Sequence, residues 1–76
     1  MAEIKYNNYN LVFTFQNGSD LIQYFTGRKC TDLNNMIDYC FSWIDKFGDK
    51  YGEIIEVEIY EKINGDYFLV YDNVMN

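Results

Sequence analysis

The chain contains no histidine and no proline, and only two of its 76 residues are cysteines, Cys30 and Cys40. Without histidine or a C-x-x-C pair, a zinc site has almost no ligands to use. Histidine is also the usual general base near neutral pH, and the five glycines are scattered through turns instead of forming a phosphate-binding loop. We therefore expect a protein that is not an enzyme and that binds neither a cofactor nor a metal.

Long apolar runs are also absent from the sequence. The segment after Met1, AEIKYNNYN, is polar and unlike a signal peptide, and no stretch approaches the length that spans a bilayer. We expect a cytoplasmic protein with no membrane partner. Disulfides are rare in that reducing compartment, and Cys40 falls on the apolar face of a predicted helix, where a buried thiol behaves as a small hydrophobic group.

Positive charge is scarce, since the chain has six Lys and Arg residues but twelve Asp and Glu residues, and its net charge is −6 at pH 7. Residues 1–31 carry a charge of +1 and residues 32–76 carry −7. Such a field repels nucleic acid and favours approach to basic proteins. We expect a protein partner with a basic surface and no direct binding of nucleic acid, although the same charge would also keep a small aromatic-rich domain soluble.

A chain of this length forms one domain, residues 1–76. The run YNLVFTFQ, the turn residues NGSD and the run LIQYFTG predict a hairpin over residues 9–27. Its pairing places Leu11, Phe13, Phe15, Ile22 and Tyr24 on one face and Val12, Thr14, Gln23 and Phe25 on the other. An alternative interpretation makes residues 21–27 a turn of helix, because short apolar runs are ambiguous.

Apolar residues recur at spacings of three and four from Leu33 to Phe47, which predicts an amphipathic helix over residues 32–47. Thr31 is the predicted N-cap. The polar side of this helix carries three acids, Asp38, Asp45 and Asp49.

The dipeptide Asn64-Gly65 predicts a two-residue type I′ turn within a hairpin over residues 53–72. The resulting register pairs Lys62 with Tyr67, Tyr60 with Leu69, Ile59 with Val70 and Glu58 with Tyr71. The apolar face of this hairpin should join the core and comprises Ile55, Val57, Ile59, Phe68 and Val70. The other face comprises Glu56, Glu58, Tyr60, Lys62, Tyr67, Leu69 and Tyr71.

These elements predict an α+β fold of order β-β-α-β-β, a four-stranded antiparallel sheet with one amphipathic helix packed on one face. One helix covers only one side of such a sheet, so the other side stays open. An apolar patch left open on a small protein usually marks a contact site. The predicted partner-binding residues are Glu56, Glu58, Tyr60, Tyr67 and Tyr71, and the helix acids Asp38, Asp45 and Asp49 form a rival surface.

Three features describe the general build of this chain. They are the run EIIEVEIYEK beside DYFLVYD, the acidic second half, and a composition rich in Asn, Tyr, Ile and Phe. In that build it resembles the small acidic inhibitors of bacteriophages, such as anti-CRISPR proteins and DNA-mimicking glycosylase inhibitors. Alternate strand residues lie ~6.6–6.8 Å apart, so Glu56 and Glu58 present charges at about the interval of successive phosphates. The resemblance implies an inhibitor that blocks a basic, nucleic-acid-handling surface of a larger partner. A second hypothesis is a small structural or regulatory homodimer that uses the open face as its interface.

Overall fold

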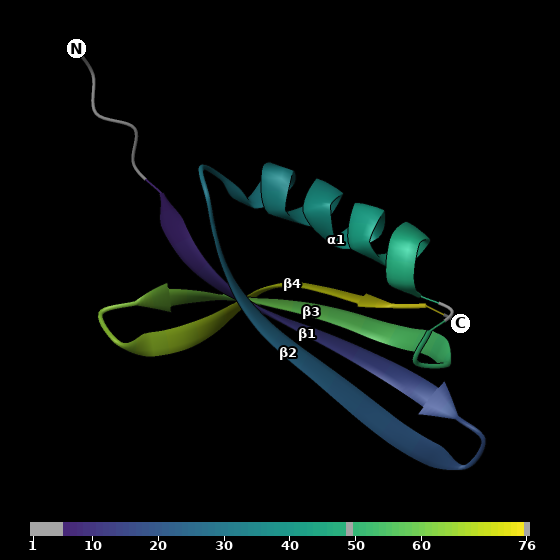
Figure 1. Cartoon of the computed structure of the whole chain (residues 1–76). Coiled ribbons are helices and arrows are strands. Elements are labelled where there is room, and N and C mark those ends of the chain that lie inside the picture. The colour runs from purple at the N-terminus through teal and green to yellow at the C-terminus, as the bar shows by residue number, and fades with distance from the viewer. Residues whose placement is uncertain (1–5, 49, 76) are drawn as a thin grey trace.

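The computed structural model describes residues 6–48 and 50–75, which form one antiparallel sheet with one helix lying across it (Figure 1). The strands are β1 (Asn7–Asn17), β2 (Asp20–Cys30), β3 (Glu53–Ile63) and β4 (Asp66–Val74), and the helix α1 (Leu33–Phe47) lies between β2 and β3 in the chain. The order across the sheet is β2-β1-β3-β4. The predicted β-β-α-β-β fold is confirmed.

The first hairpin extends beyond the predicted range at both ends. Asn17 pairs with Asp20, so only two residues form the turn, and the first of them, Gly18, has a φ of 67°. The pairs of Phe13 with Tyr24 and of Val12 with Phe25 confirm the predicted faces. Residues 21–27 are strand throughout, and the alternative interpretation of this segment as a helical turn is wrong.

The helix begins one residue later than predicted. Asp32 is its N-cap, and its carboxylate accepts a hydrogen bond from the backbone N–H of Asn35 at 2.8 Å. The prediction of Thr31 as the N-cap is wrong, because the helical hydrogen bonds begin one residue later, with the Met36 N–H donating to the Asp32 carbonyl, and Asp32 therefore holds the capping position. The Thr31 hydroxyl instead accepts a hydrogen bond from the Asn35 side chain at 2.9 Å.

The core lies between the helix and the two central strands, β1 and β3. Its fully or almost fully buried side chains are Tyr9, Leu11, Phe13, Phe15, Met36, Cys40, Trp43, Val57 and Ile59. Phe13 stacks on Trp43 with ring centroids 4.4 Å apart, and Tyr24 stacks on the same indole at 5.2 Å. Burial raises the pKa of the Cys40 thiol to about 12, in agreement with a thiol that serves as a hydrophobic group.

The second hairpin has the predicted turn, in which Asn64 and Gly65 both have positive φ angles of 52° and 88°. Pairing is as predicted from this turn to the pair of Tyr60 with Leu69. Beyond that pair a β-bulge adds one unpaired residue, Val70, to β4.

Because of this bulge, Tyr71 pairs with Ile59 and Asp72 pairs with Glu58. The predicted pairs of Ile59 with Val70 and of Glu58 with Tyr71 are therefore wrong. Tyr71 turns toward the core, where it is half-buried, and Asp72 takes the place beside Glu58.

A second bulge lies in β3, opposite the step from Thr14 to Phe15. Phe15 pairs with Ile54 and Thr14 pairs with Glu56, so Ile55 is the extra residue. Ile54 packs against the core, and the prediction of Ile55 for this position is wrong. The Ile55 carbonyl instead accepts the backbone N–H of Met75 at 2.8 Å.

Phe68 was predicted to join the core, and it is not buried although it lies on the helix side of the sheet. It pairs with Glu61, which faces the buried Tyr9. The β3–β4 turn projects past the end of the helix (Figure 1), so this part of the face has no cover and Phe68 is 51% exposed.

Candidate functional site

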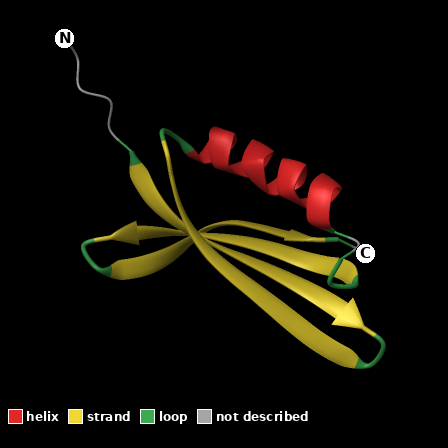
Figure 2. Ribbon diagram, viewed as in Figure 1, coloured by secondary structure: helices red, strands yellow, loops and turns green. Residues whose placement is uncertain are grey.

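The open face of the sheet is the side turned away from α1 (Figure 2). Side chains alternate between the two faces along each strand, so the observed pairing fixes its membership. From β2 across β1 and β3 to β4, it comprises Leu21, Gln23, Phe25, Gly27 and Lys29; Asn8, Asn10, Val12, Thr14 and Gln16; Glu53, Glu56, Glu58, Tyr60 and Lys62; and Tyr67, Leu69, Asp72 and Val74.

Large apolar side chains border this face on both edge strands. Five of them are more than half exposed: Leu21 and Phe25 on β2, and Tyr67, Leu69 and Val74 on β4. Soluble monomers rarely leave so many large apolar groups open on one side, and such patches mark contact sites. The open face therefore has the composition of a binding surface.

Three carboxylates meet at one corner of the open face, on β3 and β4. Glu58 pairs with Asp72, and Glu56 lies two residues along the same strand. A side-chain hydrogen bond with Asp72 raises the pKa of Glu56, with smaller contributions from desolvation and from the charges of Glu58 and Asp72. The Tyr60 hydroxyl donates to Glu58 Oε2 at 2.6 Å, which raises the pKa of Tyr60. We call Glu56, Glu58 and Asp72 the acidic corner.

Thr14 lies opposite Glu56 in the centre of this face. It is 6% exposed, and its Oγ1 has no hydrogen-bond partner among the described residues. The acidic corner therefore has a buried, unsatisfied hydroxyl beside it.

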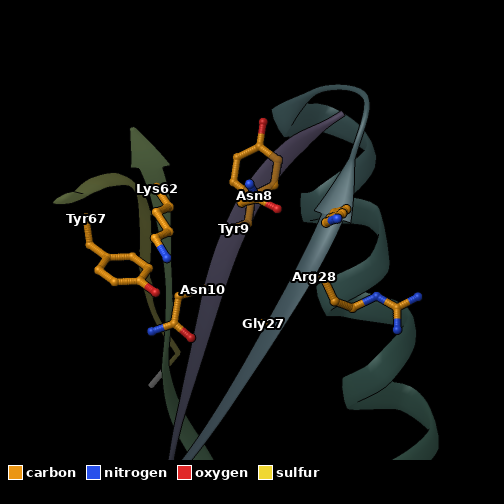
Figure 3. Close-up of a pocket in the computed structure, with 8 residues that line it drawn as sticks. Asn8, Tyr9, Asn10, Gly27, Arg28, Lys62 and Tyr67 are labelled. Atoms are coloured by element: carbon orange, nitrogen blue, oxygen red, sulfur yellow. The ribbon is translucent and has the colours of Figure 1, made fainter. Parts of the chain in front are cut away.

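The other end of the open face is basic. A hollow of about 420 Å³ opens there, and Figure 3 shows the residues that line it: Asn8, Tyr9, Asn10, Gly27, Arg28, Lys29, Lys62 and Tyr67. Lys29, Asn8 and Lys62 form one row across β2, β1 and β3. We call Asn8, Asn10, Gly27, Lys29, Lys62 and Tyr67 the lysine end. Glu56 is six residues from Lys62 along β3, a separation of ~20 Å.

The structure places four of the predicted site residues on the open face: Glu56, Glu58 and Tyr60 lie at or next to the acidic corner, and Tyr67 lies at the lysine end. The fifth, Tyr71, lies on the helix side because of the bulge at Val70.

The rival surface lies on the opposite side of the sheet. Asp38 and Asp45 are exposed on α1, and Asp49 lies outside the described residues. These helix acids cannot act together with the acidic corner on one flat partner surface, because the sheet separates the two groups.

The sequence interpretation did not include Asp72 among the site residues, nor any residue of the lysine end except Tyr67. Asp72 lies in the site only because of the β4 bulge, and no local sequence pattern predicts that bulge. Lys29 lies in β2 beyond the predicted end of the hairpin at residue 27. A longer predicted strand would have placed it in a row with Asn8 and Lys62.

Comparison of the chain with protein-family models, with curated proteins and with solved structures gave no match. Across residues 6–48 and 50–75, no helix has both the length and the apolar character needed to cross a membrane. The same residues include no group of three or more His, Cys, Asp or Glu side chains arranged to hold a metal ion. The candidate site is thus defined by the open face and its charge pattern.

Proposed function

We propose that this protein is a protein-binding inhibitor whose open face covers a basic, nucleic-acid-handling surface of a larger partner. The observation that carries the proposal is the acidic corner, three carboxylates gathered beside exposed apolar side chains of β4. The nucleic-acid-handling character of the partner rests on the resemblance in build to small acidic phage inhibitors. Blocking a surface in this way requires no catalytic residue.

The acidic corner favours a cationic partner for a specific electrostatic reason. A hydrogen bond with Asp72, together with smaller contributions from the charges of Glu58 and Asp72, raises the pKa of Glu56, so the three carboxylates repel one another once all are ionised. A Lys or Arg side chain of the partner would relieve that repulsion and release any proton held by Glu56. Affinity should therefore rise with pH through the Glu56 titration.

Exposed apolar side chains next to the acidic corner would supply the short-range contacts. Leu69 and Val74 lie on the same strand as Asp72 and are more than half exposed. Charges at the rim mainly accelerate and orient encounter, whereas buried apolar anchors hold a complex together. The lysine end would repel a basic surface, which confines the contact to the part of the face around the acidic corner.

The test is capture of a partner by the tagged protein from bacterial lysate, followed by washes of increasing salt. The triple variant Glu56→Gln, Glu58→Gln and Asp72→Asn should lose the partner. The variant Asp38→Asn with Asp45→Asn removes charge of the same sign from the helix and should retain it. The captured protein must bind nucleic acid, and the purified inhibitor must displace that nucleic acid in a competition assay. Loss of capture only in the helix variant, or a captured protein that keeps its nucleic acid, would refute the proposal.

A second candidate function, the homodimer, is favoured by the opposite charges at the two ends of the open face. If two protomers stack their open faces, a twofold axis between the sheets and perpendicular to the strands would set the lysine end of one protomer over the acidic corner of the other. Lys62→Glu should then give monomers, and adding Glu56→Lys to the same chain should restore dimers. A protein that sediments as a monomer at its highest soluble concentration eliminates this candidate.

A further inference from the structure

We infer that the lysine end binds a small ligand in which a phosphate group is joined to a flat ring, the chemistry of a nucleoside monophosphate. The proposed inhibitor function leaves this part of the open face unused. Glu58, the member of the acidic corner nearest to Lys62 along β3, is four residues away, a separation of ~13 Å that exceeds the screening length of about 8 Å at physiological salt. The two ends can therefore attract ligands of opposite charge independently.

The charge of the lysine end is unusual for this chain. The hollow is lined by Arg28, Lys29 and Lys62, half of the six Lys and Arg residues in a protein of net charge −6, and none of the described residues that line it is acidic. Arg28 is engaged elsewhere, because its guanidinium lies 4.0 Å from the centroid of the Tyr39 ring on the helix side. Figure 3 shows Arg28 extending toward that helix. Two lysines remain, which matches the double charge of a phosphate group.

The spacing of these lysines suits a single phosphate. Lys29 and Lys62 each pair with Asn8, one from either neighbouring strand. Strands lie about 4.8 Å apart, so the two lysine Cβ atoms are separated by about 10 Å. Lysine has a long flexible side chain with three N–H donors, and both ammonium groups can reach a phosphate seated above Asn8.

Tyr67 provides a surface for a flat ring beside that phosphate. Tyr67 is more than half exposed, and Lys62 Nζ lies 5.7 Å from the centroid of its ring. Aromatic faces stack readily on flat ligands. The amides of Asn8 and Asn10 offer donors and acceptors for a polar ring edge, and Figure 3 shows Asn10 next to Lys62 and Tyr67.

Gly27 is an independent sign that this place is kept open. A glycine inside a strand weakens the strand and often marks the close approach of a ligand. The backbone does not require glycine here, because Gly27 is not among the residues with positive φ. A Cβ at this position would meet only the Tyr9 carbonyl oxygen, at an ordinary 3.9 Å. The hollow of about 420 Å³ also falls within the size range of small-molecule sites, roughly 300–1,000 Å³.

The experiment is a titration followed by ¹⁵N–¹H correlation spectra at constant ionic strength, with adenosine monophosphate, inorganic phosphate and adenosine as separate probes. Adenosine monophosphate should shift the amide signals of the lysine end in a saturable way. Inorganic phosphate should bind the same residues more weakly, and adenosine should bind more weakly still. Equal binding by adenosine would overturn the phosphate requirement, and equal binding by inorganic phosphate would overturn the ring requirement.

Two variants separate a built site from general attraction to positive charge. Gly27→Val fills the hollow without changing any charge and should abolish saturable shifts, and Gly27→Ala serves if the larger residue disturbs the fold. Lys62→Gln should weaken binding of adenosine monophosphate by about tenfold, the usual effect of losing a charge-assisted hydrogen bond. Lys46→Gln, on the helix, removes the same charge elsewhere and should leave binding unchanged. Shifts that do not saturate, or that persist in both Gly27 variants, would overturn the inference.

Discussion

Replacement of Thr14 by valine should stabilise the protein, although it alters the centre of the open face. Thr14 is 6% exposed, and its hydroxyl has no hydrogen-bond partner among the described residues. Valine has nearly the same shape and a high preference for strands. The substitution therefore removes an unsatisfied polar group and leaves the packing as it was.

The size of the effect follows from the cost of burying a hydroxyl without a partner. Mutational data put that cost at about 1–3 kcal/mol. We expect Thr14→Val to raise the free energy of unfolding by about 1–2 kcal/mol, at the lower end because the hydroxyl can rotate. A domain of 60–100 residues gains about 4–8 °C in Tm for each kcal/mol, so the melting temperature should rise by several degrees.

Urea unfolding followed by circular dichroism measures this difference directly. Thr14→Ser is the control, since it keeps the hydroxyl and removes a methyl group, and it should destabilise the protein by about 0.8 kcal/mol. If Thr14→Val is instead destabilised by about 1 kcal/mol or more, the hydroxyl must donate a hydrogen bond. The Glu56 carboxylate opposite would be the acceptor, and the account of a buried unsatisfied group would be refuted.

Three other predictions concern the core, the acidic corner and the thiols. Phe13→Ala removes a fully buried ring stacked on Trp43 and should cost about 3–5 kcal/mol of stability. Because this cost is comparable to the whole stability of a core this small, the near-ultraviolet circular dichroism of the variant should be that of an unfolded chain. The pKa of Glu56 is raised in the folded state above its ordinary 4.5, so its contribution to stability is full below pH 4.5 and is lost as the pH rises through the folded-state pKa. Glu56→Gln should remove that loss in urea unfolding across a pH series, and an unchanged pH dependence would contradict the assignment. At pH 8 a thiol reagent should modify Cys30 and leave Cys40 unreacted until the protein unfolds, because Cys40 is buried with a pKa of about 12; two thiols reacting in the folded protein would contradict its burial.

Local signals were sufficient to predict the element order and most of the core. The periodicity from Leu33 to Phe47 requires a helix with one apolar face, and Asn64-Gly65 requires a tight turn whichever strands flank it. Alternation along β1 predicted that Leu11, Phe13 and Phe15 share one face, and the structure shows that this face forms the core. Each of these signals lies within a single element, so no knowledge of the tertiary structure is needed to interpret it.

The two bulges could not be predicted in the same way. Ile54 and Ile55 are adjacent and identical, so either could face the core. The run from Phe68 to Tyr71 is apolar or aromatic throughout and gives no alternation that would fix which residue is left unpaired. In both places the choice depends on the partner strand and on packing against the helix, which the local sequence does not contain.

The bulge in β4 determines the chemistry of the open face, because a shift of one residue moves every later side chain to the opposite face of its strand. In an unbroken register, Tyr71 would lie beside Glu58 and the site would have two carboxylates and an additional phenol. In the observed register, the Tyr71 ring contributes to the core and Asp72 becomes the third carboxylate. The hydrogen bond between Asp72 and Glu56 that raises the pKa of Glu56 therefore depends on the insertion of Val70. The electrostatic character of the proposed binding surface is thus a property of strand pairing, and substitutions that shift this bulge should alter the site without changing any of its charged residues.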